Sequence, residues 1–123
     1  MPSLMPFFRR GPGRVTPAEA RRRTADGAAV LLDVRETSEW KAGHAPDAVH
    51  LPLSRLAAGQ TLPASTSGRP VVVICRSGHR SRRAARILAG RGTDAVDVTG
   101  GMTAWAAEGL PVRNRHGAAG TVA

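Results

Sequence analysis

The stretch that decides the fold lies at residues 71–90 and reads VVVICRSGHRSRRAARILAG. It begins with four β-branched apolar residues, Val71 to Ile74, which predict a strand buried on both faces. From Ser81 to Gly90 the pattern changes to a helical period, with apolar residues on one stripe and arginines on the opposite side. A buried strand followed by an amphipathic helix is typical of an open α/β sheet.

The same alternation of strand and helix continues on both sides of this stretch. Thr16 can cap a helix that begins at Pro17 and ends near Gly27, and Glu19 occupies the capping-box position. Further elements are expected as strands at 29–32 and 95–98 and as a short helix at 102–108. In sheets of this kind ligands bind beyond the carboxyl ends of the strands. The residue that follows the best strand is Cys75.

The charged residues suggest one domain between two tails. The chain has 18 basic and nine acidic residues, a formal charge of +9. Residues 1–14 and 113–123 contain arginines but no acid, and both are predicted to be flexible tails around a domain at 15–112. That domain has a formal charge of +4 and very few aromatic residues, which does not favour nucleic-acid binding. Its mild positive field suits small anionic substrates.

Cysteine usage and hydropathy indicate the compartment. Cys75 is the only cysteine, so the chain cannot form an internal disulfide, and a reducing compartment is expected. No apolar run approaches the roughly 20 residues of a membrane helix, and the opening residues lack the order of a signal peptide. We therefore expect a cytoplasmic protein without membrane contact. The four histidines and one cysteine show no metal-ligand spacing, and no cofactor is expected.

The loop between the strand and the helix carries the chemistry, and it reads Cys75-Arg76-Ser77-Gly78-His79-Arg80-Ser81. A thiolate at Cys75 faces the amino end of the helix, where unpaired N–H groups and the helix dipole stabilise an anion. Gly78 allows the loop to curl so that successive amides point inward. Arg76 and Arg80 add positive charge. These features predict a reactive cysteine instead of an inert, buried one.

Four blocks of the chain resemble the rhodanese family, and they occur in the family's order and spacing over about residues 14–112. The blocks are Cys75-x-x-Gly78-x-Arg80, DVRE at 33–36, GHAPDAVHLP at 43–52, and GGMTAW at 100–105 with GLPV at 109–112. Two residues depart from the family pattern. Asp47 stands where the family most often has glycine, and Ala45 stands where a larger aliphatic residue is common.

The resemblance implies an α/β fold, an open sheet of about five mainly parallel strands with helices on both faces. It also implies a sulfurtransferase that needs no cofactor. Such an enzyme moves sulfane sulfur from a small anionic donor, such as thiosulfate, through a Cys75 persulfide to cyanide, a thiol or a protein acceptor. A sulfur carrier or a regulatory module that acts on a protein partner is the alternative, although regulatory modules commonly lack the cysteine.

The resemblance also assigns roles within the loop. The amides from Arg76 to Arg80, which include those of Ser77, Gly78 and His79, would bind the donor and hold the outer sulfur. The side chain of Arg80 either faces the donor or braces the loop against a carboxylate. The candidates for that carboxylate are Glu36 and Asp33, and Ser81 is a further supporting residue. A side-chain role for His79 remains open.

Loop length separates sulfur transfer from a related chemistry. Phosphatases of related fold place five residues between the cysteine and the arginine, because their loop must wrap a tetrahedral phosphate. Only four residues lie between Cys75 and Arg80, and the smaller cradle suits a single sulfur atom. His44, His50, Trp40 and Trp105 are interpreted as packing or hydrogen-bonding residues. The arginines at positions 82, 83 and 86 are interpreted as a solvated face, or as a docking face for an acidic partner that carries the acceptor.

Overall fold

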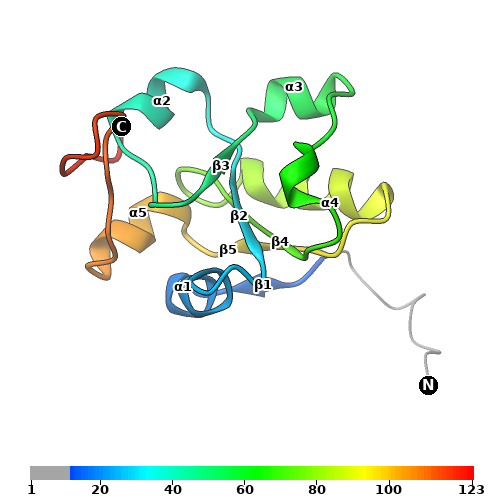
Figure 1. The fold of residues 1–123 in the computed structure, drawn as a ribbon, viewed down its shortest axis with the longest axis horizontal. Coiled ribbons are helices and arrows are strands. Elements are labelled where there is room, and N and C mark those ends of the chain that lie inside the picture. Colours follow the sequence, from blue (N-terminus) through cyan, green and yellow to red (C-terminus); the bar gives the residue numbers. More distant parts are fainter. Residues whose placement is uncertain (1–11) are drawn as a thin grey trace.

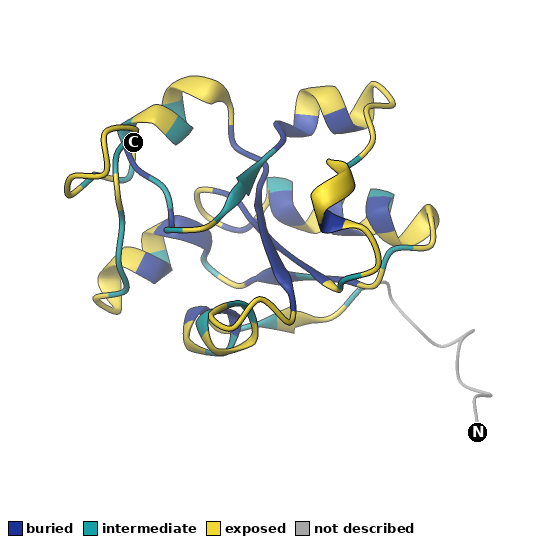
Figure 2. Cartoon of the chain, viewed as in Figure 1, coloured by how far each residue is buried: buried dark blue, intermediate teal, exposed yellow. Residues whose placement is uncertain are grey.

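The run from Val71 to Ile74 forms the central strand of a five-stranded sheet in the computed structural model, which describes residues 12–123 (Figure 1). The strands are β1 (Arg14–Val15), β2 (Val30–Asp33), β3 (Val49–His50), β4 (Val71–Ile74) and β5 (Ala95–Val98). Their order across the sheet is β1-β5-β4-β2-β3, and every neighbouring pair is parallel. All four residues of β2 and of β4 are buried, as expected for strands covered on both faces (Figure 2).

Helices cover both faces of this sheet and close two layers of core. They are α1 (Pro17–Thr24), α2 (Thr37–Ala42), α3 (Leu53–Ala57), α4 (Arg80–Gly90) and α5 (Gly101–Ala107), with a 3-10 turn, η2, at Ala64–Thr66. Helices α1 and α5 pack Ala20 and Trp105 against one face of the sheet. On the other face, α3 and α4 contribute Leu56 and Leu88. The fold class expected from the sequence is therefore confirmed.

Most predicted elements agree with the structure within one or two residues. Strands β4 and β5 have the expected bounds, β2 is shifted by one residue, and α4 starts one residue earlier than expected. Thr16 caps α1 by accepting a hydrogen bond from the amide of Glu19. The Glu19 carboxylate itself pairs with Arg22 and Arg23.

The two departures from the family pattern have a local explanation. Asp47 has φ 66°, the left-handed region that favours glycine, and among non-glycine residues Asp and Asn tolerate it best. Ala45 is fully buried against the core layer that contains Trp105. Ala45 therefore contributes a methyl group to this core layer, at a position where a larger aliphatic residue is common in the family.

Described residues of both terminal segments form backbone contacts with the domain, which composition did not predict. Arg14, assigned to the basic tail from the sequence, is part of β1, while the remainder of that tail up to residue 11 lies outside the described residues. Residues 113–123, expected to be a flexible tail, fold back onto the domain. Arg113 exchanges backbone hydrogen bonds of 2.8 Å with His44, and Thr121 donates to the Ala42 carbonyl. Val122 packs against the α1–α5 side of the core.

Across residues 12–123, no helix has both the length and the apolar composition needed to cross a bilayer.

Candidate active site

The loop from Cys75 to His79 connects the carboxyl end of β4 to the amino end of α4, and helix α5 fixes its start. The amide of Met102 donates to the Cys75 carbonyl at 2.7 Å, and the amide of Thr103 donates to the Arg76 carbonyl at 2.9 Å. Gly101 permits this approach because it has φ 57° and no side chain. A Cβ there would lie 2.7 Å from the Arg76 carbonyl oxygen and closer still to that of Cys75. The first turn of α5 therefore clamps the loop.

The sulfur of Cys75 lies beneath the curled loop, and the residue is only 1% exposed. The amide of Gly78 donates to Sγ at 3.1 Å, and Sγ lies 3.4 Å from the Ser81 hydroxyl, to which the thiol donates. Gly78 has φ 103°, which turns its amide toward the sulfur. A backbone donor aimed at sulfur stabilises negative charge there. Within the loop, Arg76, Ser77 and His79 are exposed.

A buried carboxylate supports the loop from below, and sequence reasoning missed it. Asp97 on β5 accepts a hydrogen bond of 2.7 Å from the Ser81 hydroxyl. It also pairs with Arg14, whose guanidinium donates to the Gly78 carbonyl at 2.9 Å. Cys75, Ser81, Asp97, Arg14 and Gly78 thus form a closed ring of contacts. The available signal was the carboxylate within an apolar strand, which must find a partner when buried.

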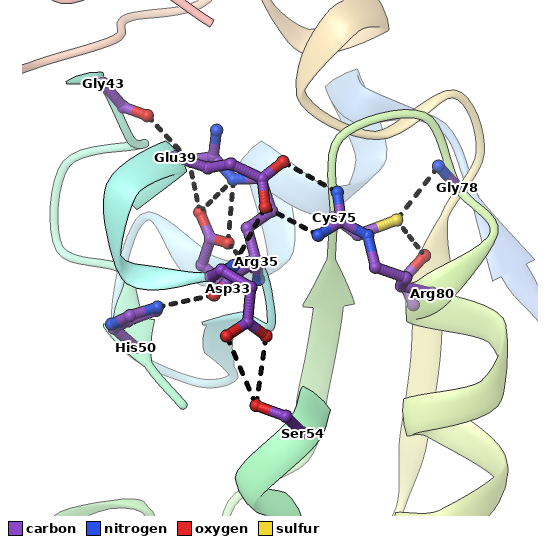
Figure 3. A network of polar contacts seen from close by, with 11 residues as sticks. Asp33, Arg35, Glu39, Gly43, His50, Ser54, Cys75, Gly78 and Arg80 are labelled. Carbon is purple, nitrogen blue, oxygen red and sulfur yellow. Dashed lines mark hydrogen bonds and ion pairs between the residues drawn. The ribbon is translucent and has the colours of Figure 1, made fainter. Parts of the chain in front are cut away.

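Arg80 braces the loop by pairing with a residue that the sequence did not indicate. Figure 3 shows its guanidinium directed from the start of α4 to Glu39 on α2, with hydrogen bonds of 2.6 and 2.8 Å. These hydrogen bonds hold the pKa of Glu39 at about 2, below its ordinary value of 4.5, and they raise the pKa of Arg80. The partner is Glu39, and neither Glu36 nor Asp33, the two candidates taken from the sequence, fills that role.

Asp33 and Glu36 instead organise the segment that supports α2. Asp33 is fully buried and forms an ion pair of 2.7 Å with Arg35, which is also fully buried and donates to the Gly43 carbonyl at 2.6 Å (Figure 3). The Nη1 atom of Arg35 has no hydrogen-bond partner in the described structure. Glu36 caps α2 and accepts from the Ser54 hydroxyl. These two carboxylates therefore act on the scaffold and do not contact the loop.

The remaining polar rings have packing or hydrogen-bonding roles, as the sequence suggested. Trp40 stacks on His44 and His50, with ring centroids 3.6 and 4.7 Å apart. Each histidine contacts a backbone carbonyl through one ring nitrogen. Trp105 is buried and donates to the Pro111 carbonyl. In the loop, Ser77 Oγ and His79 Nδ1 are 3.3 Å apart.

One cavity lies at the end of the sheet opposite to the loop. This cavity is about 510 Å³ and is bounded by Pro70 and Asp94, at the amino ends of β4 and β5. Cys75 lies at the opposite, carboxyl end of β4, so this cavity is remote from the thiol. Across residues 12–123, no three His, Cys, Asp or Glu side chains gather in a way that could hold a metal ion.

Comparison with known proteins agrees with this geometry. Residues 16–108 match the family model of the rhodanese-like domain. The chain is 36% identical over 100 residues to the HTH-type transcriptional regulator Rv0324 of Mycobacterium tuberculosis, a match that covers 80% of this chain and 43% of that protein. It therefore spans less than half the length of this curated relative.

Solved structures show the same fold. A rhodanese-related protein from Thermoplasma volcanium is similar with a TM-score of 0.72 and 32% identity, covering 81% of this chain and 96% of that one. The rhodanese-like domain of Alr3790 from Anabaena is similar with a TM-score of 0.68 and 26% identity, covering 82% of this chain and 78% of that one.

Proposed function

This chain belongs to the rhodanese-like domain family, and from that premise we propose that it transfers sulfane sulfur through a persulfide on Cys75. The observation that carries the proposal is the amide of Gly78, which donates to the Cys75 sulfur at 3.1 Å at the mouth of α4. A donor in that position stabilises the thiolate that attacks and the negative outer sulfur that results.

The first half of the reaction loads the enzyme. The Cys75 thiolate attacks the outer sulfur of thiosulfate, a new S–S bond forms, and the bond from that sulfur to the sulfonate breaks. Sulfite leaves with the bonding electron pair, and Cys75 retains one extra sulfur as a persulfide anion. Arg76 is exposed at the loop and forms no ion pair within residues 12–123, so its charge is available to attract the doubly negative donor.

The second half returns the enzyme to its starting state. Cyanide or a thiolate attacks the outer sulfur, the Cys75 S–S bond breaks, and the electron pair returns to the Cys75 sulfur as a thiolate. The products are thiocyanate or a new persulfide, and neither half-reaction needs an oxidant. The two halves share one covalent intermediate, which predicts ping-pong kinetics.

The size of the loop favours sulfur over phosphate. Four residues separate Cys75 from Arg80, and Arg80 is engaged by Glu39. A transferring phosphoryl group needs donors around three equatorial oxygens. A short loop whose arginine is held away by a carboxylate offers fewer such donors. We expect no hydrolysis of aryl phosphates.

A second candidate function rests on the regulatory relative. The chain is similar to a transcriptional regulator over 100 residues, so it is also a candidate for a sulfur-carrying or regulatory module that acts on a protein partner. Such a module would load Cys75 but turn over small acceptors slowly.

Steady-state kinetics with thiosulfate and cyanide tests the proposal. We expect thiocyanate formation with parallel double-reciprocal plots, and none from Cys75→Ser. Rapid loading of Cys75 with negligible cyanide turnover would favour the carrier or regulatory module. Hydrolysis of an aryl phosphate that depends on Cys75, without thiocyanate from any donor, would contradict sulfur transfer.

A further inference from the structure

The outward side of helix α4 carries a patch of three exposed arginines, Arg82, Arg83 and Arg86, which we call the α4 arginine patch. The opposite side of the helix is buried and packs Ala84 and Leu88 into the core. Within residues 12–123, no carboxylate lies at ion-pair distance from any of the three arginines. Packing therefore leaves their positive charge uncompensated.

The carboxylates close to Cys75 do not neutralise the patch either, because each already has a cationic partner. Asp97 pairs with Arg14 on the strand side of α4. Glu39 pairs with Arg80 at the amino end of the helix. The side of the active-site loop that leads onto α4 is therefore positive, and the exposed Arg76 extends that charge into the loop itself.

The α4 arginine patch is continuous with the active site. Helix α4 starts at Arg80, directly after the loop that holds Cys75. At a rise of 1.5 Å per residue, the patch extends from the first helical turn to about 9 Å along the axis. A molecule that binds across the patch would thus reach the mouth of the loop with one end.

We infer that the α4 arginine patch docks an acidic protein surface that presents the sulfur-accepting thiol to Cys75, an inference that rests on the proposed function. The Cys75 residue is 1% exposed, so a thiol on a large partner has to be held at the loop mouth for transfer. The partner thiolate attacks the outer sulfur of the persulfide, the Cys75 S–S bond breaks, and Cys75 leaves as the thiolate. Complementary charge across such a surface steers association and fixes orientation.

A nucleic-acid partner fits this surface less well. Base stacking needs exposed aromatic rings beside the cations. In the described part of the chain, Trp105 is buried and Trp40 is stacked on two histidines. No aromatic side chain occurs on α4, and a nucleic acid has no thiol to accept the sulfur.

The test compares two variants with the same change in charge. The first replaces the α4 arginine patch by alanine, and the second replaces Arg21, Arg22 and Arg23 of α1, which lies on the opposite face of the sheet. Each persulfidated protein receives a short peptide with one cysteine between two runs of glutamate, or its counterpart with glutamine. The mass gain of the peptide gives the rate of sulfur transfer.

We expect wild type and the α1 variant to transfer sulfur to the glutamate peptide about tenfold faster than to the glutamine peptide at low salt. In the α4 variant this preference should fall to about twofold or less, and high salt should abolish it in all three proteins. At high salt, turnover of thiosulfate with cyanide should be the same in the α4 variant as in wild type, because the patch contacts neither substrate and salt screens its long-range attraction for the anionic donor.

Three results would overturn the inference. The α4 variant could keep the preference, both variants could lose it equally, or the patch could bind a short DNA duplex tightly without any peptide preference. Docking is also measured without chemistry, by fluorescence anisotropy of the labelled glutamate peptide, with serine in place of its cysteine, on Cys75→Ser protein. If the wild-type protein never forms a persulfide but the peptide binds through α4, sulfur transfer alone is refuted. If the α4 variant and the α1 variant both bind the peptide as tightly as the unsubstituted surface does, the docking surface is refuted.

Discussion

Arg80 donates two hydrogen bonds to the carboxylate of Glu39, at 2.6 and 2.8 Å, and thereby joins the first residue of α4 to helix α2. The other end of the active-site loop is held by the amides of Met102 and Thr103 in α5. The six-residue segment from Cys75 to Arg80 is therefore fixed at both ends. We therefore expect Arg80 to position the loop and Arg76, which is exposed, to be the loop cation that meets an anionic donor.

The Arg80–Glu39 pair makes stability depend on pH. The pKa of Glu39 is lowered to about 2 by hydrogen bonds from Arg80, so the stabilisation is present above the ordinary value of 4.5 and is lost as the pH falls toward 2. Glu39→Gln should cost about 1–2 kcal/mol at pH 7, less than the full pKa shift implies, because the Arg80 side chain is 34% exposed and solvent screens the pair. Urea denaturation of both proteins at several pH values measures this difference. A difference that stays constant between pH 7 and pH 2.5 would argue against the pair.

Alanine substitutions of the two loop arginines should change kinetics and stability differently. Arg76→Ala should raise the KM for thiosulfate several-fold with little change in melting temperature, because an anion contact is lost from an exposed residue. Arg80→Ala should lower the melting temperature and also kcat, because it releases Glu39 and the start of α4. Kinetics and thermal melts on the same two proteins separate these roles. If both variants keep wild-type kinetics, neither arginine serves the reaction.

Alanine substitutions at two glycines with positive φ, one in contact with the loop and one in open space, test whether α5 clamps the loop. Gly92→Ala, at φ 87° with open space around the site, should cost about 1 kcal/mol from backbone strain alone. Gly101→Ala should cost several kcal/mol, because its Cβ meets the carbonyls of Cys75 and Arg76. It should also depress persulfide formation by moving the loop. Equal losses of stability in the two variants would show that α5 does not clamp the loop.

The buried carboxylate of Asp97 should matter far more than an exposed one. Asp97→Ala leaves the Ser81 hydroxyl without its acceptor and Arg14 without its carboxylate partner, and we expect a loss of about 2–4 kcal/mol. Glu19→Ala, which breaks exposed ion pairs on α1, should cost about 0.5 kcal/mol. Chemical denaturation of both variants tests the comparison. An Asp97→Ala protein as stable as the Glu19→Ala control would mean that the ring beneath the loop contributes nothing.

Local sequence pattern was sufficient for the centre of this fold. The β-branched run Val71–Ile74 and the amphipathic helix after it occur where the pattern predicted, and the loop between them brings Gly78 onto the Cys75 sulfur. Strands β1 and β3 have only two residues each, too few to show a period of two, so only the family resemblance anticipated a sheet of about five strands.

Contacts between residues far apart in the sequence could not be predicted from local sequence pattern. Glu39 is 41 residues from Arg80, and nothing local distinguishes it from Glu36, which was one of the two carboxylates predicted to pair with Arg80. Arg14 lies in a glycine- and proline-rich segment that resembles a tail, yet it closes the ring on Asp97. The segment after Val112 also reads as a tail, and its backbone hydrogen bonds to Ala42 and His44 leave no trace in composition.

Intact mass after incubation with thiosulfate tests the central claim most directly. Wild-type protein should gain one sulfur atom, about 32 Da, and lose it again on addition of cyanide, because the transferred sulfur resides in a persulfide. Since Cys75 is the only cysteine, Cys75→Ser should gain nothing under the same conditions. A wild-type protein that never gains this mass from thiosulfate or any other sulfane sulfur donor, or a Cys75→Ser protein that does, would contradict the assignment of Cys75 as the sulfur carrier.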